Sequence, residues 1–485
     1  MNKNLKILFV SSEVVPYAKT GGLAYVAESL PKTISQLGHD IRIVLPKYKS
    51  VDDKKFSLSY VCELNKSGSL KVANLPETNI KVYFIQNDKY YNRDRLYGTE
   101  KGDYPDNAER FIYFCKSTLE FLKKIDWKPD CIHLNDWPCG LVPVYLELLA
   151  EKDNFYKNMA TVWTIHNLAY QGIFSKEIMK IAELPLSLFT LDKLEFWGMI
   201  NFMKAGLIFS DLISTVSEAY SKEIQNGDEF GMGLEGVLKE RSKDLYGIIN
   251  GIDYNQWNPE TDKNLPLTYN IASISKKLEI KKHLLNKFNI PFNINTATIG
   301  LVTRLDNQKG IDIFIESIDD LMKLNVRFII LGSGERKYHE SLKMLSKKYP
   351  EKICISLKFD EKLAHIIYSG SDFILMPSKF EPCGLAQLIS FRYGTVPIVR
   401  AVGGLADTVK NFDINRKTGS GFTFSDYSSK ALIGAVKNAL EVYNDKKIWS
   451  KLIVKNMKLD FSWKKSAEKY IELYGKAIRK NTFKM

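Results

Sequence analysis

The chain has 485 residues, 45% of them hydrophobic and 26% charged, and its formal net charge at pH 7 is +13. This length exceeds what a single core usually supports, and the composition excludes wholesale disorder, so we expect two large folded domains. The basic balance could indicate nucleic acid. The lysines are scattered, however, and form no block of five or more basic residues, which favours a solvated basic surface and no nucleic-acid partner. An anionic small substrate fits the same charge.

The six cysteines form no Cys-x-x-Cys pair and have no histidine at zinc spacing, which is typical of free thiols in a reducing compartment. The first apolar run, residues 5–10, is too short for a signal peptide. No apolar run is long enough to span a bilayer. We therefore expect a cytoplasmic protein without a membrane partner.

The first predicted element is a buried strand, Leu5–Val10, which leads through Lys19-Thr20-Gly21-Gly22 into an amphipathic helix. One face of that helix carries Val26, Leu30, Ile34 and Leu37. Backbone amides at a glycine pair can approach a ligand closely at the positive end of a helix, and Lys19 adds a mobile positive charge. This chemistry suits a phosphate or diphosphate, although strand-Gly-Gly-helix turns are also often purely architectural.

The strand-and-helix rhythm continues through the first half of the chain. A helix is predicted at Asn107–Lys124, and strands are predicted at Ile41–Leu45, Cys131–Leu134, Ala160–Ile165 and Leu212–Val216. The segment between residues 51 and 102 is irregular. A polar stretch without periodicity, residues 260–270, is interpreted as the domain linker.

A second series begins at Ala297 and ends with an amphipathic helix, Trp463–Ile478. It predicts helices at Ile311–Leu324 and from Ala386, and strands at Ala297–Thr303, Arg327–Leu331 and Phe373–Met376. Two such series predict two doubly wound α/β domains, each with a parallel sheet. Ligands of such sheets lie at the carboxyl ends of the strands, so we expect the site in an intervening cleft.

Two cations follow the first strand of the second series. Arg304 and Lys309 lie between that strand and a helix, where they could clamp a diphosphate. They could equally be solvated loop residues.

Glu381 lies in Lys379-Phe380-Glu381-Pro382-Cys383-Gly384-Leu385, again between a strand and a helix. Amides after Pro382 could bind a phosphate, while the carboxylate could hold hydroxyls or steady developing positive charge. Alternatively, Glu381 is simply a residue of the helix start. The tetrapeptide Gly-Gly-Leu-Ala occurs both at residues 21–24 and at 403–406, either by coincidence or because both domains offer a glycine turn to one ligand.

Two strands of the first half end in residues suited to a sugar. Asp136, with Trp137, could bind hydroxyls and the apolar face of a pyranose, and His166 follows the next strand. A lone histidine is more often structural. No Gly-x-Gly-x-x-Gly fingerprint, Walker loop or metal-ligand cluster occurs. The residues themselves indicate a cationic, glycine-lined cleft for a nucleotide sugar or a similar phosphoanion, and leave the reaction open.

The chain resembles the bacterial glycogen synthases and plant starch synthases of glycosyltransferase family 5. The resemblance covers essentially the whole chain and rests on seven motifs in register. They are Lys19–Leu23, Asn135–Trp137, His166–Gly172, Asn250–Asp253 with Trp257–Pro259, Arg304–Gly310, Glu381–Leu385 and Gly403–Val409.

This resemblance implies the GT-B fold, with two doubly wound Rossmann-like domains facing each other across a deep cleft. The N-terminal domain would span residues 1–250, the C-terminal domain residues 251–462, and a helix in residues 463–485 would return to the N-terminal domain. The implied activity is retaining transfer of glucose from ADP-glucose, or UDP-glucose, to the non-reducing end of an α-1,4-glucan. Neither a cofactor nor a metal is implied.

Roles for individual residues also follow from the resemblance. His166, Arg304, Lys309 and Glu381 would be catalytic, with the two cations neutralising the diphosphate leaving group. The substrate-binding residues would be Lys19, Gly21, Gly22, Asp136, Asn250, Phe359, Cys383, Gly384, Leu385, Gly403 and Gly404.

Three positions depart from the family pattern. Tyr25 stands where the family usually has Asp, Lys379 replaces an Arg and so loses a forked donor, and Ala386 replaces a residue that often carries a hydroxyl. The alternative interpretation is therefore a non-catalytic relative that only binds glucan or nucleotide. Retention of all four candidate catalytic residues favours the enzyme.

Overall fold

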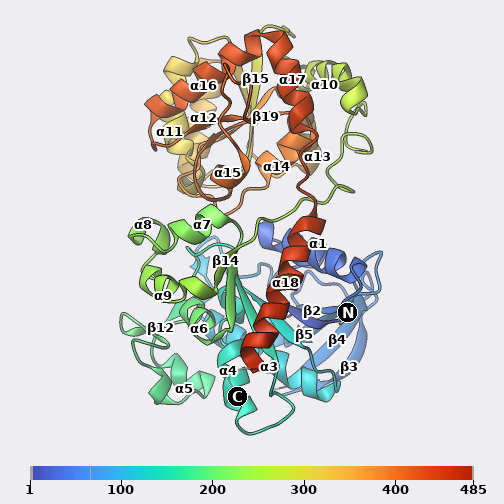
Figure 1. Cartoon of the computed structure of the whole chain (residues 1–485), viewed down its shortest axis with the longest axis vertical. Helices are drawn as coiled ribbons and strands as arrows, with labels where there is room; N and C mark the ends of the chain where they lie inside the picture. The colour runs from blue at the N-terminus through green and yellow to red at the C-terminus, as the bar shows by residue number, and fades with distance from the viewer. Residues whose placement is uncertain (1–3, 66, 483–485) are drawn as a thin grey trace. The chain divides into compact units, whose positions relative to one another are not determined.

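A computed structural model describes residues 4–65 and 67–482 (Figure 1). The first three residues of the predicted N-terminal domain and the last three of the predicted C-terminal segment lie outside the described residues. The chain forms two compact units. Unit 1 comprises Met1–Val216, Ser221–Ile249 and Trp463–Met485, and unit 2 comprises Ser217–Tyr220 and Asn250–Ser462.

Unit 1 is built on a nine-stranded sheet with the order β14-β13-β9-β8-β1-β2-β5-β4-β3. The strands from β14 to β5 run parallel, and β4 and β3 continue the sheet antiparallel. The strands are β1 Lys6–Val10, β2 Asp40–Pro46, β3 Ser59–Leu64, β4 Gly68–Asn74, β5 Lys81–Gln86, β8 Cys131–Asn135, β9 Ala160–Ile165, β13 Leu212–Thr215 and β14 Leu245–Gly247. Strands β1, β8 and β9 are buried throughout almost their whole length, as expected for parallel strands covered on both faces.

The helices of unit 1 surround this sheet, and the unit also contains two small separate sheets. The helices are α1 Gly22–Gln36, α2 Asp88–Tyr91, α3 Asn107–Lys124, α4 Val142–Ala150, α5 Ile178–Ala182, α6 Phe202–Phe209, α8 Asp228–Gly231, α9 Glu235–Glu240 and α18 Trp463–Thr482, and α7 Glu218–Glu223 has residues in both units. The small sheets pair β6 Gly98–Thr99 with β7 Gly102–Asp103, and β12 Met199–Asn201 with both β10 Ile173–Phe174 and β11 Glu195–Phe196.

Unit 2 contains a six-stranded sheet with the order β17-β16-β15-β18-β19-β20, parallel throughout. Its strands are β15 Ala297–Val302, β16 Val326–Leu331, β17 Ile353–Ser356, β18 Phe373–Met376, β19 Val396–Arg400 and β20 Phe422–Phe424. Its helices are α10 Lys277–Asn286, α11 Ile311–Leu321, α12 Arg336–Lys348, α13 Glu361–Gly370, α14 Ala386–Arg392, α15 Gly403–Thr408, α16 Ser429–Asn444 and α17 Lys446–Asn456. The doubly wound α/β architecture is therefore confirmed in both units.

The final helix belongs to unit 1. In Figure 1, α18 runs along the sheet of that unit beside α1. Tyr474 on α18 and Thr164 on β9 lie 2.7 and 2.6 Å from the two ring nitrogens of His133 on β8, all of them buried. Lys480 donates to Asp244 near β14. A buried polar network thus fixes the helix to the sheet.

The proposed linker is wrong. Residues 260–270 lie inside unit 2, and the unit boundary that precedes them falls between Ile249 and Asn250. Within the stretch, Asp262 accepts a hydrogen bond of 2.6 Å from Tyr393, and Tyr269 donates to the Tyr393 carbonyl at 2.7 Å. Both side chains are buried. The polar residues serve internal hydrogen bonds, so the missing periodicity reflects an irregular packed segment.

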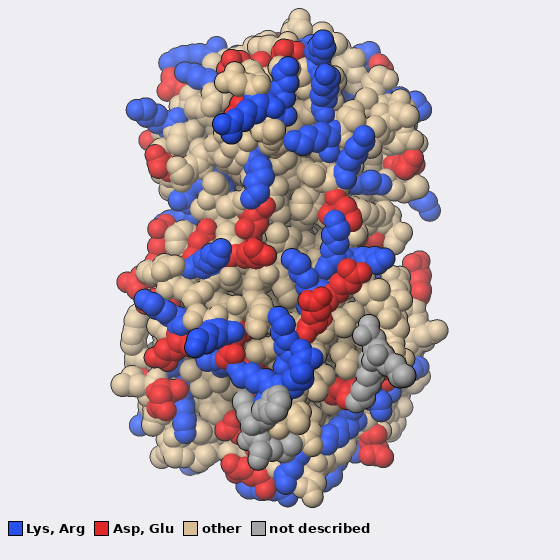
Figure 2. Space-filling view, in the orientation of Figure 1, with Lys and Arg blue, Asp and Glu red and all other residues tan. Residues whose placement is uncertain are grey.

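The surface agrees with the scattered charge of the sequence. On the face shown in Figure 2, Lys and Arg side chains lie dispersed among Asp and Glu side chains. In the described part of the chain, no helix combines the length and the apolar character that crossing a membrane requires.

Candidate active site

The glycine turn, residues 19–22, connects the region after β1 to α1 and is held by a buried carboxylate. Glu13, only 4% exposed, accepts hydrogen bonds from the backbone amides of Thr20 at 2.5 Å and Gly21 at 3.2 Å. It also accepts from the hydroxyls of Thr20 at 2.5 Å and Tyr97 at 2.9 Å. Of the glycine pair that the sequence suggested for a phosphate, the Gly21 amide is therefore bound by the protein itself, and the turn has a fixed shape.

Lys19 is exposed in front of this turn and contacts Tyr25 on α1. Its ammonium donates to the Tyr25 hydroxyl and lies 4.3 Å from the centroid of the ring. Such a contact orients the lysine while leaving its positive charge unneutralised by this partner. Tyr25, one of the three positions that depart from the expected pattern, thus contacts Lys19 through both its hydroxyl and its ring.

Asp136 and His166 come together because they follow the neighbouring parallel strands β8 and β9. Asp136 Oδ1 accepts the backbone N–H of His166 at 2.8 Å, and His166 Nε2 lies 2.8 Å from Asn135 Oδ1. Since Asn135 donates through its amide nitrogen to the Val10 carbonyl, its oxygen is the acceptor for the imidazole N–H. Asp136 has a φ of 55°, which is rare outside glycine, and backbone strain of this kind is concentrated at functional sites.

Burial sets the protonation of this pair. It raises the pKa of Asp136 to about 7, an effect that the hydrogen bonds from the His166 and Asn167 amides oppose and the nearby Glu13 charge reinforces. It lowers the pKa of His166 to about 3, so the imidazole is neutral in the physiological range. Neutral His166 can donate or accept a hydrogen bond, but it does not supply a positive charge.

The cation loop of unit 2, residues 304–310, joins β15 to α11. Asp306 accepts the Lys309 amide at 3.1 Å and so closes the short turn that orients the lysine. Gly310 has a φ of 69°, and a Cβ there would lie 2.0 Å from the Pro377 carbonyl oxygen, so only glycine fits. Arg304 is exposed and donates to Gln308 at 3.1 Å.

Lys309 and Glu381 form an ion pair. The Lys309 ammonium donates to Glu381 Oε2 at 2.6 Å, and their side chains are 17% and 7% exposed. Ser378 donates to the same oxygen at 3.1 Å. Two candidate catalytic residues from separate loops are thus brought together, with the carboxylate screened from water.

The Glu381 loop, residues 379–385, packs directly on the second glycine pair. The Gly404 amide donates to the Glu381 carbonyl at 3.0 Å and to the Pro382 carbonyl at 3.2 Å. A Cβ at Gly403 would lie 2.1 Å from the Glu381 carbonyl oxygen, and one at Gly404 would lie 2.0 Å from that of Cys383. Figure 1 shows α14, which follows the Glu381 loop, and α15, which begins at Gly403, close together in unit 2. The glycines are required for this close approach.

The remaining residues of this loop frame the start of α14. Cys383 is buried, whereas Gly384 and Leu385 are partly exposed, and Gly384 has a φ of 71°. Leu385 is the last residue before the helix.

Asn250 is also part of unit 2, and its backbone lies beside the Cys383 thiol. Burial raises the pKa of this thiol, and a hydrogen bond with the Asn250 backbone opposes that rise. The side chain is buried, and within the described structure its Oδ1 has no hydrogen-bond partner. An unpartnered buried carbonyl oxygen is costly and suits a ligand that brings a donor. Phe359 is 73% exposed, just after β17.

The sequence interpretation did not identify Glu13 or Tyr97 as site residues. The signal for Glu13 was a carboxylate in Ser11-Ser12-Glu13, directly after β1, at the carboxyl edge where a parallel sheet binds ligands. Tyr97 had no comparable signal, because it lies in the irregular segment and reaches Glu13 only through the fold.

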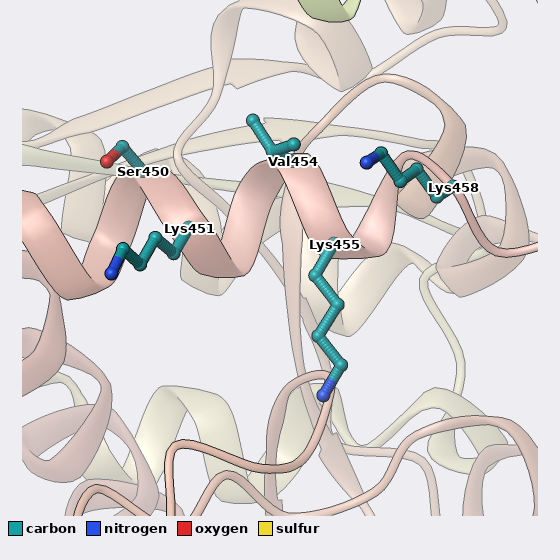
Figure 3. Close-up of a pocket in the computed structure, with 5 residues that line it drawn as sticks. All are labelled: Ser450, Lys451, Val454, Lys455 and Lys458. Carbon is teal, nitrogen blue, oxygen red and sulfur yellow. The ribbon is translucent and has the colours of Figure 1, made fainter.

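A concavity elsewhere in unit 2 contains none of the predicted site residues. Figure 3 shows it along α17, with side chains of successive helical turns at its edge. It is lined by Ser450, Lys451, Val454, Lys455 and Lys458. Lys455 is already bonded to the Gly419 carbonyl at 2.9 Å. This concavity is therefore not part of the candidate active site.

Comparison with known proteins gives consistent results over both units. Residues 6–240 match the family model for the starch synthase catalytic domain, and residues 285–453 match that for glycosyl transferases group 1. A glycogen synthase of Thermosipho melanesiensis is 44% identical over 98% of this chain and 100% of its own length. A glycogen synthase of Moorella thermoacetica is 44% identical over 99% and 98%, respectively.

Among solved structures, the catalytic domain of starch synthase IV from Arabidopsis thaliana, bound to ADP and acarbose, has a TM-score of 0.89 and 32% identity. The similarity covers 98% of this chain and 100% of that one. A sucrose-phosphate synthase from Thermosynechococcus elongatus, 16% identical with a TM-score of 0.62, shares the fold alone. Together with the parallel strands at the centre of both sheets, these similarities confirm the GT-B fold. The chain belongs to the glycogen synthase and starch synthase family and is a glycosyltransferase.

Proposed function

We propose that the protein transfers glucose from ADP-glucose to the non-reducing end of an α-1,4-glucan with retention of configuration. The observation that carries the proposal is the ion pair of Lys309 with the buried Glu381 carboxylate, beside the glycine-packed Glu381 loop. A cation positioned this way can stabilise the negative charge that develops on a departing diphosphate, and a protein that only binds glucan has no need of it.

The residues of unit 2 act on the donor. Lys309 and Arg304 neutralise the diphosphate, and the amides of Cys383, Gly384 and Leu385 bind its distal phosphate. Gly403 and Gly404 hold that loop in place through their contacts with its carbonyls. Phe359 packs its exposed ring on the base. Asn250 supplies its unpartnered Oδ1 to a sugar hydroxyl.

The residues of unit 1 position the sugar. Asp136 and neutral His166 hydrogen-bond hydroxyls of the donor glucose, with the strained Asp136 backbone directing its carboxyl group. The glycine turn approaches the donor with Lys19, Gly21 and Gly22. Glu13 fixes this turn by accepting two of its backbone amides. Glu381 both fixes Lys309 and faces the donor glucose.

The reaction is a front-face displacement. The bond between the anomeric carbon and the diphosphate oxygen breaks, and both electrons leave with the diphosphate. The acceptor 4-hydroxyl oxygen forms the new bond on the same face, and its proton passes to the departing phosphate oxygen. The products are a glucan longer by one residue and ADP, and the stereochemistry is retained.

To test the proposal, the protein is incubated with glycogen and labelled ADP-glucose or UDP-glucose, and the incorporation of glucose into glycogen is measured. The proposal is supported if labelled glucose from ADP-glucose enters glycogen and β-amylase then releases the label. A preference for UDP-glucose would mean that the donor is different and the reaction the same. Nucleotide binding without any incorporation would overturn the proposal in favour of a non-catalytic relative.

A further inference from the structure

The first turn of α3 contains a fully buried positive charge that the proposed reaction does not use. Arg110 is 0% exposed, and burial lowers the pKa of its guanidinium group. It donates to the carbonyl oxygens of Tyr90 at 2.8 Å, of Leu96 at 2.8 Å and of the Asn107 side chain at 2.6 Å. Removing a charge from water is costly, and an apolar side chain would fill the same space at a lower cost. The fork of donors therefore has a task beyond packing.

That task is to hold the irregular segment between β5 and α3. Arg110 binds two carbonyls of this segment, and the buried Asn107 side chain donates to a third, that of Tyr97, at 2.8 Å. Leu96 and Tyr97 belong to no helix or strand, so these side-chain bonds fix a backbone that regular structure does not. We call Arg110 and Asn107 the α3 clamp.

The side chain of Tyr97 extends the clamp to the glycine turn. Its hydroxyl donates to Glu13 at 2.9 Å. Since a phenol has a single hydrogen, the Ser12 hydroxyl, 2.7 Å away, donates to the Tyr97 oxygen. Glu13 in turn accepts the backbone amides of Thr20 and Gly21. A continuous series of hydrogen bonds thus joins the start of α3 to the glycine turn.

The clamp also brings a positive charge into the surroundings of Glu13. The amides and hydroxyls that donate to Glu13 are uncharged. Both Arg110 and Glu13 act on the buried hydroxyl of Tyr48: burial raises its pKa, Arg110 opposes that rise, and Glu13 adds to it. The buried cation and the buried carboxylate therefore lie in one region, where a low dielectric strengthens their attraction.

We propose that the α3 clamp positions the glycine turn for the donor diphosphate, acting through Tyr97 and Glu13. Arg110 and Asn107 are positioning residues, since their bonds go to carbonyls of the protein. A turn that is fixed before binding loses less conformational freedom when the donor arrives. Loss of the clamp thus weakens donor binding and leaves the chemical step unchanged. The inference rests on the proposed function.

The test compares Arg110→Lys and Asn107→Ala with Tyr156→Phe. A lysine keeps the charge but lacks the fork that reaches two carbonyls, and Asn107→Ala removes the bond to the Tyr97 carbonyl. Tyr156→Phe is the matched control, because its hydroxyl donates to the Leu119 carbonyl in the second half of α3 at 3.2 Å. Steady-state kinetics give KM for ADP-glucose and kcat, and calorimetry gives Kd for ADP. Both clamp variants raise KM and Kd roughly 10-fold with kcat within about twofold of wild type, and the control changes none of the three.

A double variant separates positioning from a general loss of stability. When Asn107→Ala is added to Glu13→Gln, KM rises no further than in Glu13→Gln, because both changes act through the same carboxylate. Effects on KM that multiply would overturn the proposal. An unchanged KM in the folded clamp variants, or a lower kcat at the wild-type KM, would overturn it too. If Arg110→Lys does not fold, Asn107→Ala and the double variant decide the result.

The experiment distinguishes failure of the clamp from failure of the proposed function. If the wild-type protein incorporates no glucose, the proposed function fails, and the Kd for ADP still tests the clamp. If the wild-type protein incorporates glucose and the clamp variants bind ADP and ADP-glucose as it does, the clamp alone fails.

Discussion

Lys309 Nζ donates a 2.6 Å hydrogen bond to Glu381 Oε2 across a separation of 72 residues. The pair links the cation loop after β15 to the Glu381 loop after β18, and β15 and β18 are neighbouring parallel strands of unit 2. Each residue fixes the other, because an ion screened from water is stable only with a close counter-charge. A diphosphate that binds here finds the lysine already in position.

Replacing Lys309 with Ala removes the proposed leaving-group stabiliser. We expect kcat to fall by roughly 100-fold or more, as for the loss of one preorganised electrostatic donor. Glucose incorporation from ADP-glucose into glycogen measures the effect, and Lys323→Ala, which breaks an exposed pair with Asp320, is the control. A Lys309→Ala enzyme that turns over at the wild-type rate would refute the catalytic role. Thermal unfolding of both variants separates loss of catalysis from loss of fold.

Gly404→Ala introduces a Cβ 2.0 Å from the Cys383 carbonyl oxygen. The Glu381 loop must move to accommodate it, so we expect a loss of stability of about 1–3 kcal/mol and weaker donor binding. Gly434→Ala in α16 is the matched control, because nothing lies within 4 Å of its added Cβ. That variant gains about 0.5–1 kcal/mol from helix propensity. Denaturant unfolding and ADP titration check both changes; equal behaviour of the two variants would contradict the close packing.

Glu13→Gln tests the support of the glycine turn. The variant loses the charge that accepts the Thr20 and Gly21 amides, so Lys19 and the turn lose their fixed geometry. We expect KM for ADP-glucose to rise ~10-fold, in line with the loss of hydrogen bonds to a charged acceptor. Glu63→Gln, which affects an exposed carboxylate bonded to Tyr60, leaves KM unchanged. The support role is rejected if the two variants have the same KM.

Because burial lowers the pKa of His166 to about 3, the stability and the titration of this residue should depend on pH in a defined way. The folded protein keeps this imidazole neutral while the unfolded chain takes up a proton near pH 6.5, so His166 reduces stability as pH falls from about 6.5 towards 3. We expect its imidazole NMR signals to show no titration between pH 5 and 8. His166→Gln should therefore lower activity without altering the shape of the pH–rate profile over that range. A titration midpoint near 6.5 would show that the ring is solvated.

Local patterns allowed most elements of the fold to be predicted. The strands Ala160–Ile165 and Phe373–Met376 and the helix Asn107–Lys124 have the predicted bounds, because a buried apolar run or a 3.6-residue period is a property of contiguous residues. Strands β3 and β4 were not predicted. They form a partly exposed antiparallel edge with an irregularity between Tyr60 and Cys62, so neither burial nor alternation marks them clearly.

The sequence by itself determined the two strand-helix series, the family and the residue types at the end of each strand. Only the tertiary structure decided which of these residues meet. Asp136 meets His166, and Lys309 meets Glu381, because the strands that precede them are adjacent in their sheets. Glu13 accepts the Gly21 amide, which the sequence analysis had assigned to a phosphate, and Tyr97 reaches Glu13 across 84 residues. Hydrogen bonds and ion pairs between distant residues depend on sheet order, which no local period encodes.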